Sequence, residues 1–168
     1  MKKLFAFLLA IPLLLFTGCA AQAPSEPEVP AEMESPNDET ADEAEAEEIT
    51  KMYITVNGNK LEVVLAESSS VDALVDLLKQ GDVTYEANDY GGFEKVGNLG
   101  HTLPKNDAQI TTEAGDVVLY LGNQICIFVG SNSWAYTRIG KINGYTATEL
   151  RTLLGAGEGK VQITISLK

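Results

Sequence analysis

The sequence is poor in the residue types from which metal, disulfide and nucleic-acid sites are usually built. Its 168 residues include two cysteines, one histidine and one tryptophan, and its 12 lysines and arginines are outnumbered by 24 aspartates and glutamates. So few histidines and thiols cannot supply the four ligands of a typical zinc site, and we expect neither a metal nor a cofactor. A phosphate backbone needs a clustered basic surface, so nucleic acid is not an expected partner.

Long apolar segments are scarce as well, and the one at the N-terminus is short. Residues 4–16 follow two lysines and contain a proline, so they are poorly suited to span a bilayer core of about 30 Å. Together with Thr17-Gly18 they predict an export signal over residues 1–18 rather than a retained transmembrane helix. Cys19 resembles the lipidated cysteine of a bacterial lipobox. We therefore expect an exported protein, anchored through Cys19 to the outer face of the cytoplasmic membrane; an ordinary secreted protein is the alternative.

Residues 19–50 are predicted to form a disordered tether behind the lipidated cysteine. Eleven acidic side chains and four prolines lie in residues 20–50, without lysine or arginine, and little apolar surface is available to offset the entropy of ordering. The remaining 13 acidic and ten basic side chains give residues 51–168 a net charge of −3. The overall charge of −12 therefore describes mainly the tether, and residues 51–168 are long enough for one domain with its own core.

Apolar residues alternate along most of this domain, which predicts β-strands. Asn57-Gly58 predicts a tight hairpin, because both residues tolerate the positive φ of such turns. The predicted strands cover residues 52–56, 61–65, 83–88, 93–96, 117–121, 125–129, 134–142 and 161–167, with a loop over residues 98–107.

Two short helices interrupt the strands. Serine hydroxyls precede an apolar stripe of helical spacing over residues 71–78, which Gly81 ends. Thr146 and Glu149 have the spacing of a capping box for a second short helix. Residues 117–121 and 125–129 are apolar on both faces, so we expect them between the core and a covering element. Seven or eight strands and two separate helices predict a mainly β fold, a barrel with helices at its ends.

Four segments in this order are similar to the bacterial cyclophilin-like domain family. They are VGNLGHTLP (96–104), GDVVLY (115–120), NQICIF (123–128) and SWAYTRIGKI (133–142). The resemblance covers essentially all of residues 51–168 and implies a closed, eight-stranded cyclophilin-type barrel with two helices, often found in lipoproteins. It does not imply prolyl isomerase activity, because the Phe-His-Arg and Phe-Met-x-Gln-Gly-Gly-Asp signatures of true cyclophilins are not present, and no catalytic residue is assigned.

The best candidate site is a strand face. If residues 134–138 are extended, Trp134, Tyr136 and Arg138 project from one side, where a planar cation beside two aromatic rings suits a peptide or a small ligand. The alternative is a cross-strand ladder in the barrel wall, with Arg138 paired to a rim carboxylate. The family resemblance places three further residues near this face, which are Phe93, His101 and Asn132.

Other reactive side chains are interpreted as structural. Cys126 lies in an apolar strand and is expected to be a small buried hydrophobe. Four carboxylates, Asp89, Glu94, Asp107 and Asp116, are expected on a solvated barrel rim. These observations favour a monomeric, non-enzymatic domain that binds a peptide or small molecule. The alternative function is a peptidyl-prolyl isomerase that acts on exported proteins.

Overall fold

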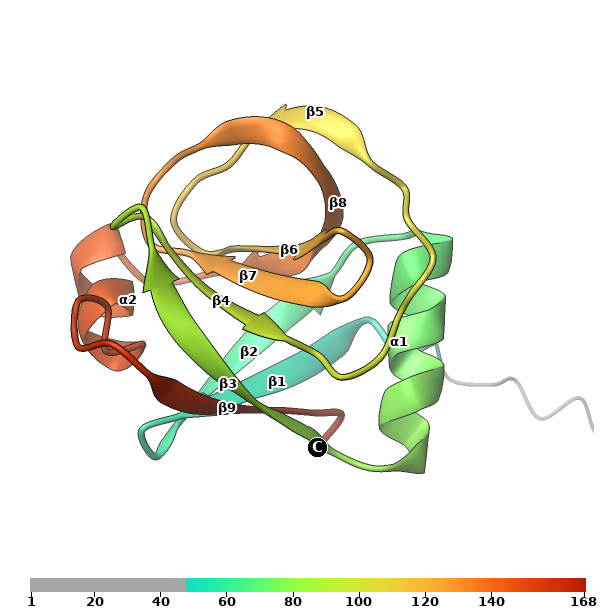
Figure 1. Ribbon diagram of the computed structural model, residues 1–168. Coiled ribbons are helices and arrows are strands. Elements are labelled where there is room, and N and C mark those ends of the chain that lie inside the picture. The colour runs from blue at the N-terminus through green and yellow to red at the C-terminus, as the bar shows by residue number, and fades with distance from the viewer. Residues whose placement is uncertain (1–47) are drawn as a thin grey trace, which may run out of the picture. The chain divides into compact units, whose positions relative to one another are not determined.

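Nine strands and two helices form the part of the chain, residues 48–168, that the computed structural model describes (Figure 1). In chain order they are β1 (Lys51–Val56), β2 (Asn59–Leu65), α1 (Ser69–Gln80), β3 (Val83–Tyr90), β4 (Glu94–Asn98), β5 (Ala108–Thr111), β6 (Asp116–Tyr120), β7 (Gln124–Phe128), β8 (Ser133–Ile142), α2 (Ala147–Leu153) and β9 (Val161–Ser166). The predicted export signal, the lipidated Cys19 and most of the predicted tether lie outside the described residues.

Eight of these strands close into an antiparallel barrel. Their order is β2-β1-β9-β3-β4-β7-β6-β8, and β8 returns to pair with β2, where Val63 lies opposite Ile142. The predicted mainly β fold, a closed eight-stranded barrel with two helices, is confirmed. The hairpin predicted at Asn57-Gly58 is confirmed too, since both residues have positive φ and join β1 to β2.

A ninth strand, β5, lies outside the ring. It pairs with the first residues of β8, Ser133 to Tyr136, whereas the later residues of β8 pair with β6 and β2. Strand β8 therefore belongs to the barrel wall only in its second half. Its first half and β5 form an arch beside β6 and β7 in Figure 1. Sequence reasoning missed β5 because its residues, except for a half-buried Ile110, are exposed and show no alternation.

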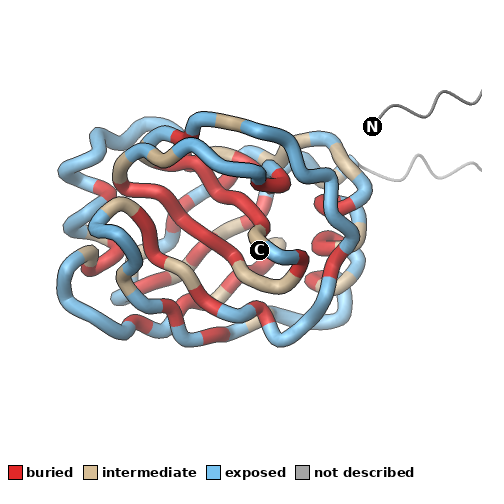
Figure 2. Tube along the Cα trace, turned by 45° about the horizontal axis from the view of Figure 1, so that its top comes forward, coloured by how far each residue is buried: buried red, intermediate tan, exposed pale blue. Residues whose placement is uncertain are grey.

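The barrel interior holds the main hydrophobic core. Alternate residues of β1, Met52, Ile54 and Val56, are buried there, and buried residues recur along the other barrel strands (Figure 2). Both helices contribute to the same core, through Leu74 of α1 and Leu150 of α2. Among the described residues, this core draws on positions from 49 to 167.

The two helices begin as their capping residues predict. The Ser68 hydroxyl accepts a hydrogen bond from the Val71 backbone N–H at the start of α1. At α2, Thr146 and Glu149 form the predicted capping box, and these hydrogen bonds lower the pKa of the Glu149 carboxyl. Within residues 48–168, neither helix has the length and apolar character needed to cross a membrane.

Strands β6 and β7 are buried on both faces, as their sequence predicts. Val117 and Leu119 face the main core, while Val118 packs on the other side of the wall with Cys126 and Phe128 of β7. This second, outer cluster is completed by Tyr136 from the first half of β8, so the arch is the covering element. The prediction that Cys126 is a buried hydrophobe is confirmed.

Candidate ligand-binding site

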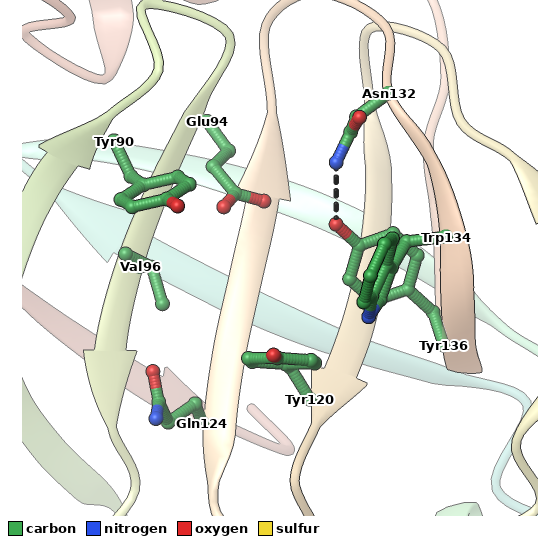
Figure 3. A pocket seen from close by; sticks show the side chains of 8 residues that line it. All are labelled: Tyr90, Glu94, Val96, Tyr120, Gln124, Asn132, Trp134 and Tyr136. Carbon is green, nitrogen blue, oxygen red and sulfur yellow. Dashed lines mark hydrogen bonds between the residues drawn. The ribbon is translucent and has the colours of Figure 1, made fainter.

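A pocket of about 270 Å³ opens beside the outer cluster (Figure 3). Its walls come from the end of β3, from β4, from the β6–β7 turn region and from the arch of β8. The lining residues are Tyr90, Glu94, Val96, Tyr120, Gln124, Asn132, Trp134 and Tyr136. Ligand pockets for drug-sized molecules start near 300 Å³, so this one suits a small molecule or one side chain of a peptide.

The aromatic walls of the pocket are fixed by ring-to-ring contacts. The Tyr136 ring packs edge-on against Tyr120 and Phe128, with centroids 5.8 and 5.6 Å apart. Phe93 stacks on Phe128 at 6.1 Å, and Tyr90 meets Phe93 edge-on. Offset and edge-on pairs are favourable arrangements of aromatic quadrupoles, so this chain of five rings holds the pocket shape before any ligand arrives.

Tyr136 is also held by a hydrogen bond at its polar end. The side-chain amide of Asn132 donates to the Tyr136 hydroxyl at 2.9 Å (Figure 3). Asn132 itself is anchored because its backbone N–H donates to the Thr112 hydroxyl at 3.0 Å and its carbonyl accepts from the Thr112 backbone N–H. Burial raises the pKa of Tyr136 above its ordinary value, so the hydroxyl stays protonated at neutral pH.

Glu94 is the unusual residue of the site. It begins β4, directly opposite Tyr90 on β3 and Phe128 on β7, and is only 5% exposed. Among the described residues its Oε2 atom has no hydrogen-bond partner, although buried carboxyl oxygens are normally paired. Burial raises the pKa of Glu94 to about 7, and the neighbouring Cys126 thiol offsets only part of that effect.

The adjacent residue, Lys95, is buried on the opposite side of β4. Its ammonium group lies 2.9 Å from the Asp89 carboxylate on β3 and donates to the Gly159 carbonyl at 2.6 Å. Consecutive side chains of a strand point to opposite faces, so Lys95 cannot neutralise Glu94. Glu94 thus remains the acidic group of a pocket whose lining, in the described structure, contains no lysine, arginine or histidine.

The residues proposed from sequence are only partly brought together. Trp134, Tyr136 and Asn132 line the pocket, with Trp134 55% exposed and Tyr136 buried. Phe93 lies behind it, stacked on Phe128, and His101 is an exposed residue of the segment after β4.

Arg138 does not line the pocket beside Trp134 and Tyr136. It follows the point where β8 joins the barrel wall, and its guanidinium pairs with Asp116 at 3.1 Å. Arg138 pairs with Val118 of the outer cluster and so keeps the face of Tyr136, but it lies farther along β8, beside Asp116 and outside the pocket.

The prediction of four solvated rim carboxylates is wrong for two of them. Asp116 is buried and lies 3.1 Å from Arg138 and 3.2 Å from Lys141. Glu94 is buried in the pocket, and sequence reasoning therefore missed the residue that most distinguishes the site. The available signal was the position of Glu94 at the start of a strand, two residues before Val96, whose side chain lies on the same face of β4. Only the pairing of β4 with β7 reveals that this face is covered.

The fold and the site define a closed antiparallel barrel with a small aromatic pocket outside its wall. The model of the Cyclophilin-like family matches residues 54–166, and the chain belongs to this family. A comparison with curated proteins gave no match. Among solved structures, the chain is similar to the solution structure of a hypothetical protein from Archaeoglobus fulgidus, with a TM-score of 0.54 and 19% identity over 73% of this chain and 99% of the other. At this identity the likeness supports the fold alone.

Proposed function

We infer that the domain is a non-enzymatic binding module whose pocket takes a small molecule or one side chain of a peptide. The observation that carries this proposal is the buried Glu94 carboxyl at a preformed aromatic pocket, where its Oε2 atom has no hydrogen-bond partner among the described residues. An unsatisfied buried oxygen disfavours the ligand-free state, so a ligand that supplies a donor gains binding energy there.

Binding is favoured over catalysis by the groups around Glu94. A carboxyl pKa near neutrality also suits general acid–base chemistry, but a reaction needs a second group that attacks or polarises the substrate. No cysteine, serine, threonine or basic residue lines the pocket in the described part of the chain. The nearby Cys126 thiol is buried, and burial raises its pKa, so it is poorly suited to act as a nucleophile.

The test is a fragment screen followed by NMR on the chain from residue 20 onward. We expect fragments of side-chain size to shift the NMR signals of the pocket residues. Trp134→Ala should lower the affinity of these fragments by about tenfold or more, because an exposed aromatic wall is lost. Tyr145→Ala is the matched control, because Tyr145 is an exposed aromatic residue outside the pocket lining. Fragments that bind elsewhere, or bind Trp134→Ala equally well, would contradict the proposal.

We further propose that the domain acts outside the cell, tethered to the cytoplasmic membrane by a lipid on Cys19. The support is the apolar segment, the small residue pair and the cysteine at the N-terminus. In a bacterial host the full chain should incorporate labelled fatty acid and fractionate with membranes. Cys19→Ser should lose the label, whereas Cys126→Ala, which changes the buried cysteine, should retain it. Equal labelling of Cys19→Ser would overturn the proposal.

A further inference from the structure

The chemistry of the pocket also limits the class of ligand, on the premise that the proposed binding function is right. Glu94 lies in the pocket wall, and its carboxyl group points away from β4 toward the side of the pocket that holds Asn132 and Tyr136 (Figure 3). Glu94 is only 5% exposed to solvent, and its Oε2 atom has no hydrogen-bond partner among the described residues. A buried acid in such a position is stabilised most by a ligand that brings both an N–H donor and a positive charge.

The protein's own cations near the pocket are already engaged. Lys95 is bound to Asp89 on the other face of β4, and Arg138 is paired with Asp116. Arg151 donates from α2 to the Gly92 carbonyl in the β3–β4 turn. None of these residues belongs to the pocket lining, so the structure leaves the charge of Glu94 to be matched from outside.

The other walls suit a cation as well. Four aromatic side chains, Tyr90, Tyr120, Trp134 and Tyr136, line the pocket around Glu94. The faces of tyrosine and tryptophan rings carry negative charge density and attract ammonium groups within about 6 Å, while their apolar surface covers a hydrocarbon stem. An anionic ligand would be repelled, because its negative charge would face both the Glu94 carboxylate and the negative faces of these rings.

We propose that the pocket binds an organic cation, a primary or secondary ammonium on a slender hydrocarbon stem, with the ammonium donating to Glu94 and the aromatic rings enclosing the stem. A cavity of about 270 Å³ has room for a stem of this kind but not for a large ring system. Two sources share this chemistry, which are a free alkylamine and the lysine side chain of a peptide.

The proposal requires a defined pH dependence of binding. The groups that face Glu94 are Tyr90 from β3, Cys126 from β7, Tyr136 from β8 and Tyr120 from β6. Burial raises the pKa of both Cys126 and Tyr136, so these two stay neutral between pH 6 and 8. Burial raises the pKa of Glu94 to about 7, and an ammonium ligand prefers the ionised carboxylate. Its affinity should therefore rise roughly tenfold from pH 6 to pH 8, with release of a proton on binding.

The experiment titrates the chain from residue 20 onward with matched probes at pH 6 and pH 8. Nα-acetyl-lysine amide is compared with Nα-acetyl-norleucine amide, which lacks only the terminal ammonium, and butylamine is compared with 1-butanol. At pH 8 each amine should bind at least about tenfold more tightly than its neutral counterpart, and the preference should shrink at pH 6. Tighter binding of the lysine derivative would indicate a peptide source, and equal or tighter binding of butylamine a free amine.

Variants separate this inference from the proposed function. Glu94→Gln keeps the side-chain shape without the charge, so it should abolish the preference for an amine over its neutral counterpart. Glu62→Gln is the matched control, because Glu62 is an exposed carboxylate of β2 paired with Lys51. Thermal unfolding of both variants checks that they are folded.

Two results would overturn the cation proposal. One is equal affinity for amines and neutral probes, and the other is an amine preference that survives in Glu94→Gln. In either case the binding function stands if pocket binding by neutral fragments is lost in Trp134→Ala. If neither amines nor neutral fragments bind in the pocket, both proposals fail.

Discussion

The two faces of β4 carry neighbouring buried charged residues, one with partners for its charged group and one with an unpaired oxygen. Lys95, on one face, is fully buried and meets both the Asp89 carboxylate and the Gly159 carbonyl. Glu94, on the other face, is almost as buried and leaves an oxygen unpaired among the described residues. A paired buried charge stabilises one arrangement of the structure. An unpaired buried charge destabilises the ligand-free protein, and a ligand that pairs with it removes that cost. The difference separates the structural face of this strand from the candidate functional face.

Removing Lys95 should have the largest effect on stability. Lys95→Met keeps the length of the side chain but leaves Asp89 and the Gly159 carbonyl without their partner. We expect a loss of about 4 kcal/mol in the free energy of unfolding, measured by urea denaturation. Lys160→Met is the control, because Lys160 forms an exposed pair with Glu86 and should change stability by less than about 0.5 kcal/mol. Similar values for the two variants would show that the Lys95 face is not the structural one.

Glu94→Gln should raise the free energy of unfolding relative to the wild-type protein, and only at neutral or higher pH. The folded-state pKa of Glu94 is raised from 4.5 to about 7, so the folded protein holds this proton more tightly than the unfolded chain. The resulting stability is complete below about pH 4.5, is lost as the pH rises through about 7, and stays absent above that.

Relative to Glu94→Gln, the wild-type protein should therefore lose about 3 kcal/mol of unfolding free energy between pH 4.5 and pH 8. Urea denaturation at several pH values measures this difference, and Glu62→Gln provides the control for loss of an exposed carboxylate. A wild-type to Glu94→Gln difference that does not change with pH would mean that Glu94 is solvated or paired in solution.

Tyr136→Phe tests the rigidity of the pocket wall at an intermediate scale. The change removes the hydroxyl that accepts the Asn132 hydrogen bond but keeps the ring contacts with Phe128 and Tyr120. We expect a loss of about 1 kcal/mol in unfolding free energy. Tyr145→Phe is the matched control at an exposed ring, and an equal effect in both variants would argue against a structured wall.

Trp134→Ala should have the smallest effect on stability although it is expected to remove most ligand binding. Its side chain is more than half exposed and belongs to the arch rather than to the closed barrel. We expect a change within about 0.5 kcal/mol in thermal or urea unfolding. A large loss would indicate that Trp134 is a structural part of the barrel wall.

Local signals in the sequence were sufficient for most of the fold. Asn57-Gly58, a serine cap before the first helix and the Thr146–Glu149 capping box each act over a few residues, and each was found where predicted. Strand β5 escaped notice because an exposed strand carries no burial pattern. Of the candidate site, the sequence indicated Trp134 and Tyr136, since paired aromatic residues at a strand start are visible without a structure.

What the sequence by itself determined is the two helices and the eight barrel strands, because turns, caps and alternation depend on near neighbours along the chain. Which strands meet, and in which register, was decided only by the tertiary structure. The pairing of β4 with β3 and β7 sets Lys95 against Asp89 and places Glu94 between Tyr90 and Phe128. Adjacent charges that look equivalent in the sequence thereby become a satisfied structural pair and an unsatisfied acid in an aromatic pocket.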